Sequence, residues 1–160
     1  MAAPGFDPAR RRFLTGRGPG TPPPWADAAR LHTLCTGCSS CVDACPEGIL
    51  VAGAAGVPEV EFQRGECTFC QACADACPEP IFASRERQPW DLRAAIGDAC
   101  LTLRGVVCQS CRDTCASGAI RFTPALRSAP RPTVETDQCT GCGACVAGCP
   151  VQAITVAAHG

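Results

Sequence analysis

The chain lacks lysine and tyrosine altogether, and its 160 residues include one methionine, two histidines and no long apolar run. Because arginine, alanine, glycine and proline are abundant, we attribute the missing residue types to compositional bias rather than to function. No segment approaches the roughly 20 consecutive apolar residues of a transmembrane helix, which argues against membrane insertion. No glycine-rich nucleotide loop, nucleophile elbow or carboxylate pair stands out either. We therefore expect no enzyme activity, and we interpret the isolated His32 and His159 as surface residues.

Basic residues gather at the start of the chain. Residues 1–30 carry five arginines and two aspartates, whereas the remaining nine arginines and thirteen acids give the rest a charge of −4. The RRRFL stretch at 10–14 looks like the start of a twin-arginine export signal, but such a signal needs an apolar region of roughly 7–15 residues after it. Glycines, prolines and Arg17 follow instead. We expect an irregular basic tail and a soluble protein that stays in the cytoplasm, where thiols remain reduced.

The sixteen cysteines, a tenth of the chain, fall into four runs. Three runs have the spacing C-x2-C-x2-C-x3-C followed by proline, while the run at 100–115 has seven residues between its first two cysteines and alanine after its last. Such self-similarity indicates an internal repeat. The cysteines are Cys35, Cys38, Cys41, Cys45, Cys67, Cys70, Cys73, Cys77, Cys100, Cys108, Cys111, Cys115, Cys139, Cys142, Cys145 and Cys149.

This spacing is typical of the ligands of [4Fe–4S] clusters. Three cysteines wrap one cluster, and the fourth starts a short helix and ligates the other cluster of a pair. The crossed arrangement predicts four clusters that use every cysteine. The ligand sets are Cys35, Cys38, Cys41 and Cys77; Cys67, Cys70, Cys73 and Cys45; Cys100, Cys108, Cys111 and Cys149; and Cys139, Cys142, Cys145 and Cys115. Disulfides between such close cysteines would be strained, and structural zinc sites use two separated pairs, so both alternatives are disfavoured.

The variant run contains an apolar insert, LTLRGVV at 101–107. We expect this insert to fold over the third cluster and to exclude water, which would move the reduction potential of that cluster away from those of its neighbours. The alternative is that Cys100 is not a ligand and that the site holds a three-iron or labile cluster.

Short β-rich segments between the runs predict two hairpins, one joining 49–51 to 60–62 and the other joining 120–122 to 133–135. We expect an α+β fold: two tandem bacterial-ferredoxin-like modules, each binding two [4Fe–4S] clusters, with an irregular N-terminal tail. Modules of roughly 60 residues have small cores, so the apo-protein is expected to be largely unfolded. The predicted domains are a basic, proline-rich tail at 1–30, module 1 at 31–86, a linker at 87–98 and module 2 at 99–160.

Several motifs together resemble the NapF family, the ferredoxin-type accessory proteins of the periplasmic nitrate reductase. They are RRRFLTG at 10–16, PPPW at 22–25, QPWDLRAAIGDACL at 88–101, the variant run and the closing CTGCGACVAGCP at 139–150. The resemblance implies a cytoplasmic protein that contacts the precursor of the molybdenum catalytic subunit. It also implies help with the acquisition or reduction of that subunit's own iron–sulfur cluster before export. The sixteen cysteines match the ligand positions of the family.

Two points stay open at this stage. The chain could instead be a general polyferredoxin, an electron-relay subunit of a respiratory or reductase complex. In either role we expect no nucleic-acid partner. The signal-like Arg10, Arg11, Phe13 and Leu14 are candidates for docking the client or its chaperone, with an unstructured basic tail as the alternative.

Overall fold

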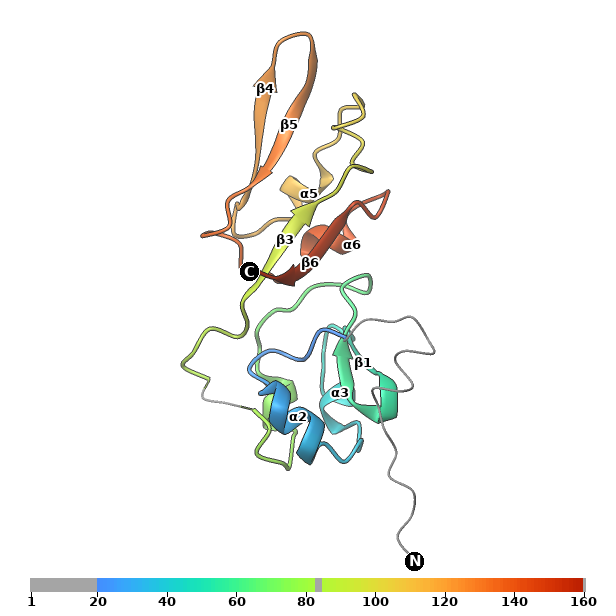
Figure 1. The fold of residues 1–160 in the computed structure, drawn as a ribbon, viewed down its shortest axis with the longest axis vertical. Coiled ribbons are helices and arrows are strands. Elements are labelled where there is room, and N and C mark those ends of the chain that lie inside the picture. The colour runs from blue at the N-terminus through green and yellow to red at the C-terminus, as the bar shows by residue number, and fades with distance from the viewer. Residues whose placement is uncertain (1–19, 83–84, 160) are drawn as a thin grey trace, which may run out of the picture. The chain divides into compact units, whose positions relative to one another are not determined.

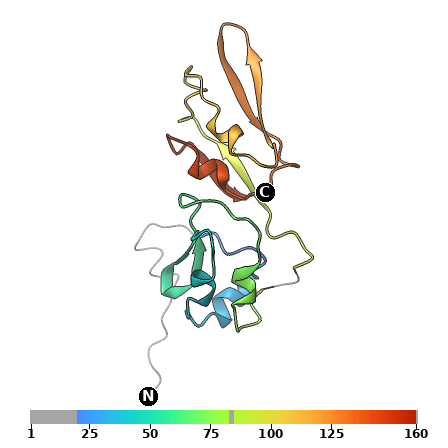
Figure 2. The same ribbon diagram turned by 180° about the vertical axis from the view of Figure 1, so that it is seen from behind.

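The computed structural model describes residues 20–82 and 85–159, so Arg10, Arg11, Phe13 and Leu14 lie outside the described part. The chain divides into two compact units (Figures 1 and 2). Unit 1 takes the described residues up to Glu61 together with 71–87, and unit 2 takes 62–70 together with the described residues from Gln88 onward. None of the helices in these ranges has the length and apolar character needed to cross a membrane.

Unit 1 begins with a packed extended segment that ends in a helix. The side chain of Trp25 is buried, and its Nε1 donates a hydrogen bond to the carbonyl oxygen of Arg87 at 3.0 Å. Asp27 caps helix α2 (Ala28–Leu34) by accepting a hydrogen bond from a backbone N–H of the first turn. The segment predicted as an irregular tail is therefore packed from residue 20 onward, because its prolines and tryptophan supply apolar surface.

The rest of unit 1 alternates short helices and strands. Its further elements are α3 (Ser40–Asp43), β1 (Leu50–Ala52), the 3-10 turn η1 (Ala54–Gly56), β2 (Pro58–Val60) and α4 (Ala72–Asp75). β1 and β2 pair antiparallel, with Leu50 opposite Val60, which confirms the first predicted hairpin with its strands shifted by one or two residues. Leu50 packs with Cys41 and Cys73 in a buried cluster, so the core lies directly beside the cysteine loops.

Unit 2 contains two antiparallel pairs of strands. Its elements are β3 (Leu92–Ile96), α5 (Ser110–Asp113), β4 (Ile120–Ala125), β5 (Ser128–Val134), α6 (Ala144–Ala147) and β6 (Ile154–Ala158). β4 pairs with β5, as the second predicted hairpin requires, and β3 pairs with β6. Residues 87–98, predicted as a linker, thus contain a strand of unit 2. The alternation of buried Leu92 and Ala94 with more exposed neighbours explains why this segment is a strand.

Each cysteine run places its short helix in the same way. The four-residue helices α3, α4, α5 and α6 each contain the third cysteine of a run, and that cysteine is buried in every case. The expectation that the helix starts at the fourth cysteine is wrong by about one turn. In three runs the fourth cysteine precedes proline, and the residue before proline is disfavoured in the helical conformation.

Candidate metal centres

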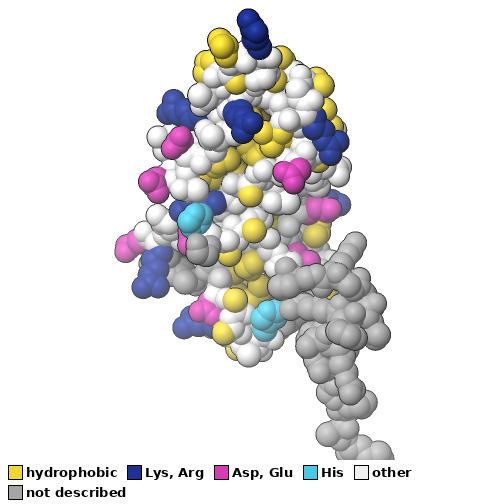
Figure 3. All heavy atoms as spheres, turned by 45° about the horizontal axis from the view of Figure 1, so that its top comes forward, with side chains coloured by type: hydrophobic (Ala, Val, Ile, Leu, Met, Phe, Trp, Pro, Cys, Tyr) yellow, Lys and Arg dark blue, Asp and Glu magenta, His cyan; other side chains and the backbone are white. Residues whose placement is uncertain are grey.

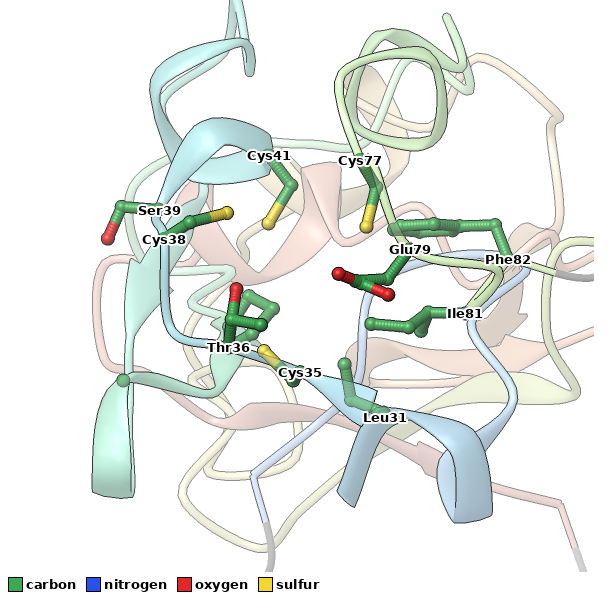
Figure 4. Close-up of a pocket in the computed structure, with 12 residues that line it drawn as sticks. Leu31, Cys35, Thr36, Cys38, Ser39, Cys41, Cys77, Glu79, Ile81 and Phe82 are labelled. Atoms are coloured by element: carbon green, nitrogen blue, oxygen red, sulfur yellow. The ribbon is translucent and has the colours of Figure 1, made fainter. Parts of the chain in front are cut away.

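The first cavity lies in unit 1 and is lined by four cysteines. Cys35 and Cys38 come from the loop after α2, Cys41 comes from α3, and Cys77 follows α4. Figure 4 shows their sulfur atoms directed towards the same space, with Leu31, Ile81 and Phe82 on its apolar side. These four cysteines are the first of the ligand sets that the crossed arrangement predicts.

The sulfur atoms surround this cavity rather than meeting at one point. Among the described residues, no three histidine, cysteine or acidic side chains lie close enough to hold a single metal ion. A cluster of four iron and four sulfide ions is larger than one ion, and four thiolates around one cavity are the donor set that it takes. The residues of the first cavity therefore fit a [4Fe–4S] cluster.

The thiols of this cavity influence one another electrostatically. Burial raises the pKa of the Cys41 thiol, and the neighbouring Cys77, Cys35 and Cys38 raise it further. A hydrogen bond with the Ser40 hydroxyl lowers the pKa of exposed Cys38, with backbone groups adding to the effect. Four thiolates held this close repel one another, and the positive iron ions of a cluster are what would offset that repulsion.

A second cavity, in unit 2, is lined by Cys115, Cys139, Cys142 and Cys145. Burial raises the pKa of Cys145 to about 12, and the next largest contributions come from Cys142, Cys139 and Cys115. This is the fourth predicted set, in which the last cysteine of the variant run joins the first three of the closing run. In each unit, therefore, one cavity is lined by a set of four cysteines that matches a predicted ligand set.

Three cysteines of the variant run also lie near one another. Burial raises the pKa of Cys111 to about 11, and nearby Cys100 and Cys108 contribute in the same direction. The fourth predicted ligand of this set, Cys149, accepts a hydrogen bond at its Sγ from the N–H of Ala153 at 3.2 Å.

The remaining predicted set combines Cys67 and Cys70 with Cys45 and Cys73. Cys45 packs against the buried cluster of unit 1 that contains Cys73. Cys67 and Cys70 lie on residues 62–70, which group with unit 2, and there the N–H of Cys67 donates to the carbonyl oxygen of Cys142 at 2.8 Å. This ligand set stays a prediction.

The loops between the first three cysteines of the regular runs share an unusual backbone. In each loop the residue before the second cysteine and the residue after it have positive φ, between 55° and 89°. These residues are Gly37 and Ser39, Phe69 and Gln71, and Gly141 and Gly143. Left-handed residues between right-handed ones turn successive N–H groups towards a common centre, which is a nest that binds anionic groups and occurs in many iron–sulfur sites.

Close packing explains the glycines of the closing run. A Cβ on Gly141 would lie 2.5 Å from the carbonyl oxygen of Leu92, and one on Gly143 would overlap the ring of Phe62. Glycine therefore serves two purposes at these positions. It adopts positive φ without strain, and its lack of a side chain lets Leu92 and Phe62 lie close to the loop.

Serine hydroxyls lie beside three of the predicted ligands, a feature that sequence reasoning missed. The distance from Sγ to Oγ is 3.4 Å for Cys38 and Ser40, 3.6 Å for Cys108 and Ser110, and 3.5 Å for Cys115 and Ser117. The signal was present in the sequence, since each serine stands two residues after its cysteine. At the corresponding position after Cys142 stands Ala144, which has no hydroxyl.

The insert of the variant run differs from its expected form. The hydroxyl of Thr102 is buried and donates to the carbonyl oxygen of Cys108 at 2.7 Å, which closes the insert into a compact turn. Leu103, Val106 and Val107 are 44%, 54% and 70% exposed. The prediction that the insert covers the third cluster is wrong for these three side chains, because the short turn leaves them facing solvent.

Comparison with known protein families also finds a repeated domain in this chain. The model of the 4Fe-4S dicluster domain matches twice, at residues 34–81 and 106–153. Two dicluster domains imply four [4Fe–4S] clusters, and the sixteen cysteines are enough to supply four ligands for each cluster.

Several known proteins are similar to this chain over most of its length. It is 47% identical to the ferredoxin-type protein NapF of Escherichia coli K12 over 94% of both chains. It is 49% identical to NapF of Haemophilus influenzae over 86% of this chain and 78% of that protein. It is also 38% identical to one subunit of an ion-translocating oxidoreductase complex from Methanosarcina acetivorans, over 75% of this chain and 46% of that protein.

Proposed function

The chain belongs to the NapF family of ferredoxin-type proteins, and from that premise we propose that it is a cytoplasmic iron–sulfur accessory protein of the periplasmic nitrate reductase. Its client is the precursor of the molybdenum catalytic subunit, which it binds before export and supplies with electrons or iron–sulfur clusters. The observation that carries the proposal is the full-length similarity to NapF proteins together with a cysteine content that four clusters use completely.

Under this proposal, the chemistry is that of iron–sulfur clusters bound to the cysteines. Bound by four thiolates, a [4Fe–4S] cluster supplies reversible one-electron transfer. The chain's own part is to hold the cluster, to donate hydrogen bonds to its sulfurs and to set its access to solvent. The proposal gives the chain itself no catalytic residue.

Exposure of the ligands supports exchange with a partner. The third cysteine of each run is buried, whereas Cys38 and Cys70 are exposed. A site with one ligand at the surface lets a docked partner approach closely. That arrangement suits either electron delivery or the handing over of a cluster.

The proposal is tested by anaerobic co-purification from the cytoplasmic fraction. We expect the holo-protein to retain the catalytic subunit that still bears its export signal, and to retain much less of the mature form. Equal retention of both forms, or of neither, would contradict the proposal. Loading the protein with labelled iron then separates the two kinds of delivery, because only cluster transfer moves the label into the client.

A second candidate function is that of a general electron-relay subunit. The similarity to the protein of the ion-translocating oxidoreductase complex favours it, although this chain covers only 46% of that protein. Stoichiometric association with a quinol-oxidising membrane subunit, without retention of the catalytic precursor, would establish this function instead.

A further inference from the structure

The hairpin of β4 and β5 projects from the rest of unit 2 (Figures 1 and 2). Its register gives the hairpin two different faces. On one face Ile120 lies opposite Val134 and Phe122 lies opposite Pro132, and these side chains are buried or half-buried. Successive side chains of a strand point to opposite sides, so the intervening residues form the other face.

That other face is polar, exposed and basic. Arg121 pairs with Thr133, and Thr123 pairs with Arg131, so the two arginines are diagonal neighbours on one surface. All four side chains are exposed. At the turn, Arg127 stands beside Leu126, which is 94% exposed. In Figure 3 the uppermost part of the view carries dark blue and yellow side chains, and the magenta acidic groups lie farther down.

No ion pair within the described residues joins these arginines to an acidic group. The strands and turn from 120 to 134 contain no aspartate or glutamate, whereas Glu135 directly follows β5 and its N–H donates to the carbonyl oxygen of Ala119. Arg121 donates to the side-chain oxygen of Gln138 at 3.5 Å. The ion pairs found in the described part of the chain involve Arg85, Arg93 and Arg112, and none of the hairpin arginines. Like charges that share one face of a hairpin repel each other. An anionic partner removes this repulsion.

The corresponding hairpin of unit 1 provides an internal comparison. β1 and β2 have three residues each, and the segment from 50 to 60 contains Glu59 but no arginine. Each hairpin follows the fourth cysteine of a run, Cys45 in unit 1 and Cys115 in unit 2. Binding of clusters therefore requires neither the length nor the charge of the β4–β5 hairpin, which points to an additional role for it.

Three prolines restrict how a partner can bind to the β4–β5 hairpin. Pro124, Pro130 and Pro132 interrupt both strands and remove backbone N–H donors, so the hairpin is a poor template for the addition of a further strand. A partner is held by side chains instead. Arginine is enriched at protein–protein interfaces.

We propose that Arg121, Arg127 and Arg131, with Leu126 at the tip, form a docking face for an acidic surface of a partner protein. Under the proposed function, on which this assignment of the partner rests, that surface belongs to the catalytic precursor. Four clusters with their thiolates add a formal charge of about −2 each when oxidised, so the holo-protein is acidic elsewhere. The hairpin is thus the part of unit 2 suited to holding an acidic partner.

The first test uses an oligoglutamate peptide and does not depend on the identity of the client. The R121Q/R127Q/R131Q variant is expected to bind the peptide roughly tenfold more weakly than the wild type at low ionic strength, and with a shallower salt dependence. Unchanged binding would overturn the proposal. An unchanged visible absorption spectrum of the clusters shows that the variant is correctly folded.

A matched variant removes three other exposed arginines. R85Q/R104Q/R112Q changes the net charge by the same amount, but two of its arginines are ion-paired and the third donates to the carbonyl oxygen of Asp98. We expect it to keep wild-type affinity for the peptide. An equal loss in both variants would show an effect of net charge alone and would overturn the assignment to the hairpin.

The second test repeats the comparison with the catalytic precursor. Loss of binding only in the hairpin variant supports the proposal, and equal binding by the wild type and the hairpin variant overturns it. No binding by the wild type contradicts the proposed function, and the oligoglutamate result then decides the role of the hairpin. A larger effect of the variant on binding to duplex DNA or to anionic lipid vesicles than on binding to oligoglutamate would also overturn it.

Discussion

Replacing Ser110 by alanine is expected to lower the reduction potential of the third cluster. The Ser110 hydroxyl lies 3.6 Å from Cys108 Sγ, and once Cys108 is a thiolate ligand only the hydroxyl can donate. A hydrogen bond to a ligand sulfur stabilises the reduced cluster, which is more negative, more than the oxidised one. Its removal therefore makes the cluster harder to reduce.

The size of the shift follows from the strength of one hydrogen bond. A typical hydrogen bond contributes a net 0.5–1.5 kcal/mol, with a central value of about 1 kcal/mol. For a one-electron couple, about 59 mV corresponds to a tenfold change in the equilibrium constant, which is about 1.4 kcal/mol. The oxidised cluster accepts the same bond more weakly, so only part of this energy appears in the shift, and the expected decrease is at most about 65 mV.

Potentiometric titration followed by EPR spectroscopy measures this shift. The closing run offers the reverse change, because Ala144 occupies the position after Cys142 that Ser110 occupies after Cys108. Ala144→Ser is expected to raise the potential of the fourth cluster by a similar amount. If Ser110→Ala left every potential unchanged or raised one, the reasoning from the hydroxyl would be refuted.

Further perturbations test the loops, the cysteines and the clusters. Gly141→Ala should lower the melting temperature of the holo-protein more than Gly37→Ala: both residues have a φ of +72°, but only at Gly141 would the Cβ lie 2.5 Å from backbone, that of Leu92. Equal decreases would contradict this. Cys77→Ala should remove the first cluster, a loss of about four of about sixteen irons, and spectra that showed loss of another cluster would contradict the crossed arrangement. In the folded chain without iron the pKa of Cys145 is raised from 9.0 to about 12, so a rise in pH from about 9 towards 12 shifts the iron-free chain further to the unfolded form, in which this thiol ionises more readily. Because the ligand must be a thiolate, cluster reconstitution should become faster from pH 7 to pH 9, and a rate independent of pH would be the contrary result. Chelation of iron should abolish most of the NMR signal dispersion, since the modules have small cores, whereas a native-like spectrum without iron would show that the fold does not need its clusters.

The cysteine spacing predicts four ligand sets, and two of these sets line cavities in the structure. Three ligands two residues apart can only enclose a compact group, and the fourth lies beyond a turn. The structure brings Cys77 to the first triplet and Cys115 to the last, as the crossed arrangement requires. Both predicted hairpins are present because alternating apolar residues between turn residues define short strands.

Features that depend on tertiary context could not be predicted in the same way. Leu92–Ile96 looked like a linker because its partner, β6, lies about sixty residues farther along the chain. The apolar insert of the variant run suggested a cover, but local hydrogen bonds of Thr102 close it into a turn that is too short to bury Val106 and Val107. The amphipathic character of the β4–β5 hairpin became evident only once the register of its strands was known.

Mössbauer spectroscopy combined with iron and sulfide analysis of the anaerobically purified protein tests the central claim most directly. Four clusters on sixteen cysteines predict about 16 irons and about 16 sulfides per chain, all in the [4Fe–4S] state. About eight irons, a substantial three-iron signal, or zinc in place of iron would contradict the account.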